Sequence, residues 1–590
     1  MSTRRRSAKF AALAVGLSLI AAACGGDDDD TTSTEAPETT AESSDTTAPS
    51  AETTAPSETT APSGDTTETT EGGGSGGAAM TVTYEIADTA NWDDGTPITA
   101  ADFQCTWEAN LNTPGSYVTT GYNKITSVEP GASDKEVIVS FSEVYAPYKN
   151  LFSQGTFLKA DEFDDCMDVS EAFGPEGITW SGREWKLDSW SAEQIVYVPN
   201  EGYTGPRTPG VDKVVIVPAE DGATLLKAGT VDFIFPQAYT GVDDELADPN
   251  VAYDTALSGQ YEGFYFQQAD GPFADDIFRE AFFKSIDIQG VYDQIYAPFA
   301  QGVPPLDCGP ITNPQYCDPL WTDTYDPEGA AQLLTDNGWE QDGDGMWAKD
   351  GEVPDIRFMV SSPNPRREGT QEYLIPKLTD LGFSVRADNC EAVPCVFQTR
   401  LPGLDYDFSM YINVVAPDPS YLAANFSCEQ VPSEENQFQG ANYTGWCDEA
   451  ASDLLNQADR ELDEAKRTEM VKEAIKAIRD QYVFIPLLAF PNIGAYRTDQ
   501  VGNTQGELAN YAAFNDWYQW EDTNGDGQIV IGAEQFPTND CPNPITECAS
   551  SSWFNWTVAN PVMPSAFYTT NDQQYEISEM LASEPVVTTA

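Results

Sequence analysis

The sequence predicts an α/β protein, because segments with the two-residue period of a strand alternate with segments that have helical spacing. The first strand begins at Val82, where apolar and polar residues alternate as far as Ile86. Residues 211–232 form an apolar run followed by a helical pattern that ends at a glycine. A helical pattern at 372–381 precedes a short strand pattern at 383–385, where Ser384 separates two apolar residues. With 590 residues, the chain is long enough for more than one domain.

The first 23 residues have the pattern of a signal peptide. A basic stretch ends at Lys9, and the apolar stretch 10–20 is too short to span a bilayer. The sequence AAACG at 21–25 resembles a lipobox, in which Cys24 is acylated and becomes the mature N-terminus. The alternative is a plain secretory signal followed by a chance cysteine. Acyl chains on Cys24 would anchor the protein to the outer face of the cytoplasmic membrane.

Residues 24–79 contain mostly Asp, Thr, Ser, Glu, Pro and Ala, and they close with a glycine-rich run at 72–77. Such a segment has almost nothing apolar to bury, so burial does not offset the entropy of ordering it. We therefore expect a flexible acidic stalk before a folded body that begins at Met80.

The charge of the chain excludes several classes of function. It has 29 basic and 96 acidic residues, and no basic cluster follows Lys9, which argues against a nucleic-acid partner. It contains no histidine, which removes triads built on histidine and most zinc and nickel sites. We predict no metal, no cofactor and no enzymatic activity. Among enzymes, the alternative most compatible with a chain that has no histidine is a glycoside hydrolase that uses two carboxylates.

Ten cysteines remain when Cys24 is set aside, an even number in an exported and therefore oxidising setting. We interpret all ten as structural disulfides. Their spacing suggests four short loops and leaves one pair by elimination, although the sequence does not fix the connectivity. The suggested pairs are Cys308–Cys317, Cys390–Cys395, Cys428–Cys447, Cys541–Cys548 and Cys105–Cys166.

The folded body opens with a strand, a turn and a capped helix. Gly95 supplies the positive φ of a tight turn after Asp94. Thr99 is the expected N-cap of a helix, and Asp102 is the returning carboxylate of a capping box. Residues 136–141 then alternate as a strand.

Three later stretches predict helices. Asp275 opens one that contains Ile277 and Ala281, and residues 326–338 form another with proline in the first turn and glycine beyond the end. Residues 448–481 have the strongest helical spacing of the chain.

The amino-acid sequence of the first unit resembles that of a known family. Residues 91–103, NWDDGTPITAADF, are similar to the W-x-D-G-x-P-x-T-A-x-D-[FV] signature of family 5 extracytoplasmic solute-binding proteins. This is the oligopeptide-, dipeptide- and nickel-binding type that feeds ABC transporters. The runs 200–232 and 271–287 resemble further segments of the family in the same order.

The resemblance implies a two-lobed, periplasmic-binding-protein-like fold of type II, with an extra subdomain, mixed sheets, flanking helices and a hinge. Lobe I with its extra subdomain would occupy 80–265 and lobe II 266–485. Residues 486–590 would return to lobe I.

The C-terminal part of the chain resembles the segment with which family members normally begin. Residues 527–537, GQIVIGAEQFP, are similar to the family's opening strand, and an Asn-Pro pair and a tryptophan-containing run follow in the expected order. We therefore interpret the protein as a circular permutant whose family N-terminal segment lies at 527–590. A rearranged or misassembled gene is the alternative.

The resemblance also suggests where a ligand binds. Residues 406–419 resemble the stretch beside the ligand, but Val415 stands where peptide-binding members carry an aspartate that pairs with the peptide amine. Other candidates are aromatic or polar residues near the crossover and on the displaced strand. The predicted ligand contacts are Phe264, Tyr265, Gln267, Tyr411, Asn413, Asp418, Trp446, Glu534 and Gln535.

The acidic turn at 522–529 resembles the start of a calcium-binding loop, but Ala533 stands where that loop needs a bidentate glutamate. We interpret it as a polar turn. The resulting hypothesis is a monomeric extracytoplasmic lipoprotein that captures a small solute, a short peptide in the first place, for an ABC importer. Its partners would be the permease subunits and their cytoplasmic ATPases. A surface binding module without a transporter is a further alternative.

Overall fold

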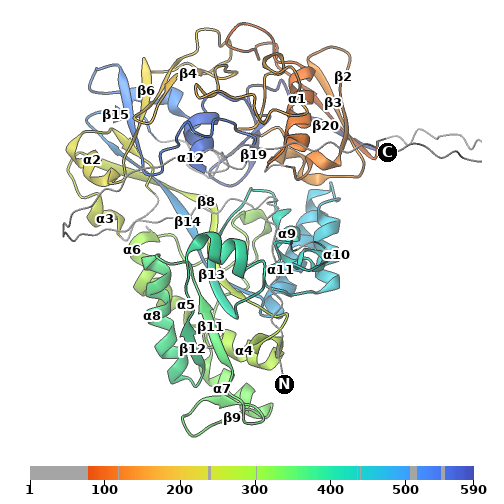
Figure 1. Cartoon of the computed structure of the whole chain (residues 1–590), viewed down its shortest axis with the longest axis vertical. Coiled ribbons are helices and arrows are strands. Elements are labelled where there is room, and N and C mark those ends of the chain that lie inside the picture. Colours follow the sequence, from red (N-terminus) through yellow and green to blue (C-terminus); the bar gives the residue numbers. More distant parts are fainter. Residues whose placement is uncertain are drawn as a thin grey trace, which may run out of the picture. The chain divides into compact units, whose positions relative to one another are not determined.

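A mixed ten-stranded sheet runs through both hydrophobic cores of the protein in this computed structural model (Figure 1). The structure describes residues 78–590 except 117–118, 154, 237–240, 301, 435, 437, 439, 505–513 and 547–551. The predicted signal peptide, residues 24–77 of the stalk with Cys24, and Cys548 therefore lie outside the described residues. Within them, no helix is long and apolar enough to cross a membrane.

The central sheet combines strands from distant parts of the chain. In spatial order its strands are β12 (Ser384–Ala387), β11 (Asp355–Met359), β13 (Phe408–Val414), β8 (Val251–Phe266), β14 (Phe484–Arg497), β7 (Phe233–Ile234), β17 (Gln528–Ala533), β6 (Lys213–Pro218), β5 (Ile195–Pro199) and β4 (Trp185–Trp190). The strands β12, β11 and β13 run parallel, as do β7, β17 and β6, and the remaining neighbours are antiparallel.

Within the described residues, the other strands form four smaller sheets. The largest has the order β2 (Ile125–Pro130), β3 (Glu136–Phe141), β1 (Met80–Glu85) and β20 (Val586–Thr589). The two-stranded ones are β9 (Glu340–Gln341) with β10 (Trp347–Ala348), β15 (Val501–Gly502) with β16 (Glu521–Asp522), and β18 (Phe567–Thr569) with β19 (Tyr575–Ile577).

The helices flank these sheets. They are α1 (Ala100–Asn112), α2 (Gly222–Ala228), α3 (Val242–Glu245), α4 (Asp276–Lys284), α5 (Ile288–Val291), α6 (Ala297–Ala300), α7 (Pro327–Asp336), α8 (Pro365–Asp380), α9 (Tyr421–Phe426), α10 (Glu449–Ala458), α11 (Glu464–Asp480) and α12 (Ser552–Phe554). The α/β class is confirmed. We name lobe I the part built on the core that contains Met80 and Trp556, and lobe II the part built on the core that contains Phe264 and Ile478.

The local signals of the sequence explain the helix ends. The Thr99 amide donates to the Asp102 carboxylate at 2.7 Å, which confirms the capping box before α1. Asp275 and Asp326 cap α4 and α7 as expected. Gly229 ends α2 in the left-handed conformation, with φ of 70°.

Two expectations about helices need correction. Helix α8 begins at Pro365 and not at Glu372, because Asn364 caps it and its first turn is polar. The predicted helix at 448–481 is two helices, because the Asp463 side chain accepts the amide of Lys466 and starts α11 as a new N-cap. The break places Asp459 and Arg460 in the turn between α10 and α11.

Residues from the C-terminal part of the chain complete both sheets of lobe I. Strand β17 lies between β6 and β7 and pairs in parallel with both, so that Ile531 faces Ile216 on one side and Phe233 on the other. Strand β20 pairs antiparallel with β1, and the amide of Ala590 donates to the carbonyl of Ala79 at 3.1 Å. The two ends of the folded body therefore lie side by side.

Candidate functional site between the lobes

The strands β8 and β14 carry the chain between the two cores (Figure 1). They pair antiparallel along most of their length, from Val251 opposite Arg497 to Tyr265 opposite Phe484. Their register shifts after Pro486, because a proline has no amide to donate to its neighbour. These strands and the loops beside them form the candidate site.

Three predicted contacts come together on adjacent strands. The rings of Tyr265 on β8 and Tyr411 on β13 stack with centroids 3.8 Å apart, and Asn413 Nδ2 donates to the Tyr265 hydroxyl at 2.6 Å. Tyr265 and Tyr411 are almost completely buried, and burial is the first cause that raises the pKa of both hydroxyls well above the usual value. The cluster is therefore polar but uncharged at neutral pH.

Asp418 is held in an ion pair. Both of its carboxylate oxygens accept from the Arg467 guanidinium, at 2.5 and 2.8 Å, and both side chains are buried. This bidentate geometry satisfies the carboxylate within the protein. Val415, three residues earlier, is 5% exposed, and its amide donates to the Gly259 carbonyl on β8. This loop thus presents no unpaired carboxylate at either position.

A hairpin of lobe I reaches lobe II at Asn313. The hairpin joins β18 to β19, and its tip contains Gln573 and Gln574. Asn313 Nδ2 donates to the carbonyls of Pro417 and Gln573, at 3.0 and 3.1 Å, and Gln574 Nε2 donates to Asn313 Oδ1. Gln573 Nε2 donates in turn to the Leu257 carbonyl on β8. Asn313 therefore connects the hairpin to the loop that carries Val415.

A cavity of about 330 Å³ lies against the crossing strands. It is lined by Leu257 of β8, Ala489 of β14 and the segment 302–307, and most of this lining is apolar. Asp307 at its rim lies close to the sulfurs of Cys308 and Cys317. Those sulfurs form a disulfide and cannot act as thiolate ligands for a metal.

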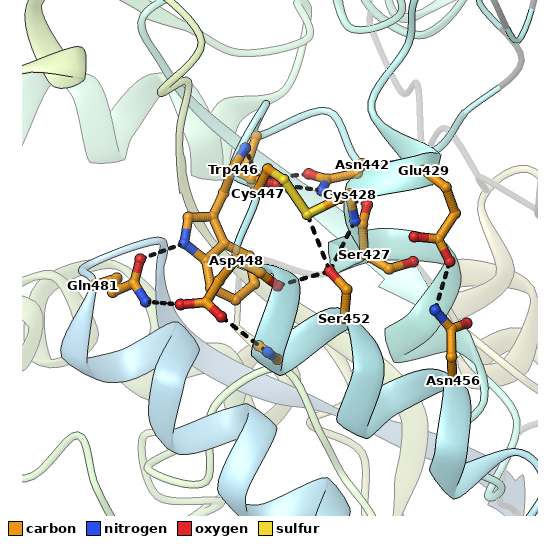
Figure 2. The surroundings of a disulfide bond; sticks show 12 residues. Ser427, Cys428, Glu429, Asn442, Trp446, Cys447, Asp448, Ser452, Asn456 and Gln481 are labelled. Atoms are coloured by element: carbon orange, nitrogen blue, oxygen red, sulfur yellow. Dashed lines mark hydrogen bonds between the residues drawn. A yellow bond between two sulfur atoms is a disulfide. The ribbon is translucent and has the colours of Figure 1, made fainter.

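The side chains of three other predicted contacts interact with neighbouring residues of the protein itself. They are Phe264, Gln267 and Trp446. Phe264 is fully buried, with its ring stacked on that of Phe408 at 5.2 Å. Gln267 Nε2 donates to the Leu404 carbonyl at 3.0 Å. Trp446 is buried, and its indole N–H donates to Gln481 Oε1 at 2.9 Å, beside the Cys428–Cys447 disulfide (Figure 2).

The last two predicted contacts, Glu534 and Gln535, follow β17 directly and are half-buried. Four of the suggested disulfides are present, namely Cys105–Cys166, Cys308–Cys317, Cys390–Cys395 and Cys428–Cys447. Cys541 is also disulfide-bonded. The acidic turn is held by Asp522, whose Oδ1 accepts the amides of Asn524 and Gly525.

Three residues of the site, Arg467, Asn313 and Gln573, are not among those predicted from the sequence. Arg467 had a signal, because helical spacing places it on the buried face of α11 with Val471, and a buried cation needs a partner. Nothing in the local sequence indicated the other two, since their contacts join segments about 260 residues apart.

Comparison with known proteins gives a consistent result. A family model described as bacterial extracellular solute-binding proteins, family 5 Middle, matches residues 78–433. The oligopeptide-binding protein OppA of Mycobacterium bovis is 25% identical over 318 residues, which cover 50% of this chain and 51% of that protein. The dipeptide-binding protein DppE of Bacillus subtilis is 22% identical over 439 residues, covering 70% of this chain and 76% of the relative. In other curated relatives, the part that matches this chain covers as little as 21% of the relative's own length.

Solved structures show the same fold. The periplasmic EDTA-binding protein EppA has a TM-score of 0.61 at 20% identity, covering 75% of this chain and 84% of its own. AppA of Bacillus subtilis, solved in complex with a nonapeptide, has a TM-score of 0.57 at 19% identity, with coverages of 76% and 88%. NikZ of Campylobacter jejuni, in complex with Ni(L-His), has a TM-score of 0.61 at 17% identity, with coverages of 75% and 88%. The periplasmic-binding-protein fold is thus confirmed.

Proposed function

Because the chain belongs to family 5 of the bacterial extracellular solute-binding proteins, we propose that it captures a small solute for an ABC importer. The observation that carries the proposal is the family match over residues 78–433, in a protein whose two cores are joined by the crossing strands β8 and β14. Two lobes on such a connection close around a ligand as rigid bodies. The partners are then the permease subunits with their cytoplasmic ATPases, and the protein itself performs no covalent chemistry.

We propose short peptides as the solute. The names of OppA and DppE, an oligopeptide-binding and a dipeptide-binding protein, support this class. The chain departs from an ammonium-binding site at Val415, and Asp418 is already paired with Arg467. Recognition therefore rests on hydrogen bonds to the peptide backbone and on uncharged groups such as those of the Tyr265 and Asn413 cluster.

Acylation of Cys24 would anchor the protein outside the cytoplasmic membrane, where a monomer on a flexible stalk meets both solute and permease. The bounds proposed for the lobes are 80–265, 266–485 and 486–590. The circular permutation is also part of this proposal. Its support is the position of β17 between β6 and β7 and the hydrogen bond between Ala590 and Ala79.

Calorimetric titration of the full chain in detergent tests the function. The probes are trialanine, N-acetylated trialanine and a nickel–histidine chelate. We expect trialanine and its acetylated form to bind with affinities within about threefold, because no carboxylate is proposed to pair with the amine; a lost charge-assisted hydrogen bond would cost about tenfold or more. Binding of the chelate alone would replace the peptide class. A folded protein that binds none of the three would contradict the proposal.

A further inference from the structure

A second contact between the lobes lies at the end of α10, beside the ion pair that holds Asp418. The segment that follows β3 in lobe I meets the end of α10 in lobe II, below the strands β2 and β3 in Figure 1. The amide of Ala146 donates to the carbonyl of Asp459 at 2.8 Å. Arg460 Nε donates to Glu143 Oε2 at 2.9 Å, and Glu143 also pairs with Lys124 of its own lobe. Residues of both lobes are thus hydrogen-bonded to each other at this point.

A compact charged cluster lies beneath this contact. Arg467 holds Asp418 in the bidentate pair, and its second nitrogen lies 3.7 Å from Asp459 Oδ1. Tyr145, the residue before Ala146, is 8% exposed, and its hydroxyl lies close enough to the cluster for the charges of Asp418 and Asp459 to act on it. Burial, followed by the charges of Asp418 and Asp459, raises the pKa of Tyr145, which stays neutral. Closing the lobes therefore brings a neutral hydroxyl near two carboxylates that share one arginine.

We propose that residues 143–146 of lobe I and the end of α10 in lobe II form a proton-dependent latch that holds the lobes closed. The inference deepens the proposed function, because it concerns the closing motion of a binding protein. It depends on no solute, and its test uses none.

The direction of the proton dependence follows from burial. In the closed form, burial and then repulsion from Asp418 raise the pKa of Asp459 to about 7, against the opposing effect of Arg467 and Arg460. When the lobes separate, water reaches the carboxyl group and its pKa returns toward about 4. The closed form thus takes up a proton that the open form releases. The latch is strongest below about pH 4, weakens as the pH rises from about 4 to 7, and stays at its weakest above pH 7.

The groups that face Asp459 from the packed elements are few. Lobe I supplies the Tyr145 hydroxyl, the turn after α10 supplies Arg460, α11 supplies Arg467, and the loop before α9 supplies Asp418. The hydroxyl of Tyr316 interacts with Arg467 and Asp418. In this cluster, the carboxyl group of Asp459 has a pKa of about 7. The Asp459 side chain keeps 26% of its surface exposed, so its proton exchanges with solvent.

Hydrogen–deuterium exchange of the full chain, followed at peptides that contain residues 143–150, measures the latch directly. The readout is the protection factor, which corrects the exchange rate for the intrinsic effect of pH. In the wild type we expect about tenfold higher protection at pH 6 than at pH 8, from a pKa near 7 in the closed form. Asp459→Asn keeps the size of the side chain and removes the titration. It should give the same protection at both values of pH.

Arg460→Gln tests the ion pair. Because this pair is partly exposed, we expect protection to fall by about two- to fivefold at both values of pH. Lys466→Gln is the matched control, since it removes the same charge from the exposed side of α11, and it should leave protection unchanged. Equal protection at pH 6 and 8 in the wild type would overturn the proposal. So would a Lys466→Gln effect as large as that of Arg460→Gln. Failure to bind peptide with an intact pH dependence would refute the proposed function and leave the latch standing.

Discussion

The ion pair with Arg467 alters the role that the motif at 406–419 predicts for Asp418. Asp418 occupies a position that resembles a ligand-side aspartate, but its two oxygens already accept two hydrogen bonds from Arg467. Both side chains are less than a tenth exposed. A carboxylate in this state orients a loop and stabilises lobe II, and it is not free to bind an ammonium group.

Removal of one partner of this pair should destabilise the protein strongly. Arg467→Met keeps the length of the side chain but leaves the Asp418 carboxylate buried without its partner. We expect the free energy of unfolding to fall by about 3–5 kcal/mol, measured by urea denaturation at pH 7. The neighbouring exposed change Lys466→Met should alter it by less than about 0.5 kcal/mol. A small effect of Arg467→Met would mean that water screens this carboxylate.

Residue-level prediction from the sequence was limited by partners that lie far away. The capping pair of Thr99 and Asp102 was predictable, because both partners lie within one turn. The stack of Tyr265 on Tyr411 depends on strand pairing between segments 146 residues apart, so only the two separate residues, and not their contact, were predictable.

At the scale of elements, the turn between α10 and α11 supplies the lobe II side of the contact with lobe I. The helical spacing continues through 448–481, so periodicity alone does not show the break. Two N-caps decide it, at Asp448 for α10 and at Asp463 for α11. The break creates the turn whose carbonyl and guanidinium meet lobe I.

The cap of α10 should make the protein sensitive to acid. Hydrogen bonds from the amide of Ala451 and from Gln481 Nε2 lower the pKa of Asp448 below its usual value. The stabilisation by the carboxylate is thus fully present above about pH 4 and is lost as the pH falls through the lowered pKa. Asp448→Asn, which retains a capping oxygen, should melt at a lower temperature than the wild type at pH 7. The difference should shrink steadily in melts recorded from pH 4.5 to pH 2.5.

The disulfides should differ in their contribution according to the loops they close. Cys105 and Cys166 are 61 residues apart, whereas Cys390 and Cys395 are 5 apart. Loop-closure entropy gives about 4 kcal/mol for the first and about 2 kcal/mol for the second. Double Cys→Ala variants, compared by thermal melting, should show the larger loss for the first pair. An equal loss would point to packing of the sulfurs as the dominant contribution.

For the whole molecule, the class of fold and the order of most elements were predictable from local patterns. The similarity of the tail to an opening strand also gave the expectation that residues 529–533 belong in the sheet of lobe I, and β17 lies there. The crossing of β8 and β14 through both cores was not predictable from either strand, because each strand carries only its own period. The crossing is determined by the pairing of β8 with β14, which joins segments far apart in the sequence.

The side-by-side ends of the body allow a direct test of the permutation. A rearranged gene would begin at residue 527, join residue 590 to residue 79 through a short glycine linker, and end at residue 526. We expect this chain to fold and to melt within a few degrees of the wild type, because the new link spans two hydrogen-bonded residues and the new ends lie in an exposed turn. As a control, ends placed inside β14 should prevent folding. If the rearranged chain also fails to fold, the present order of segments is required by the fold.

The position of β17 also fixes when each lobe can be completed during secretion. All the lobe II strands of the central sheet have left the export channel once residue 497 has emerged. In lobe I, β6 and β7 emerge about 300 residues before the strand that separates them. Until then their facing edges are open to pairing with other chains. The lobe translated first is therefore the last to mature, and a chaperone or protease outside the membrane would encounter this protein as a folded lobe II attached to an open lobe I.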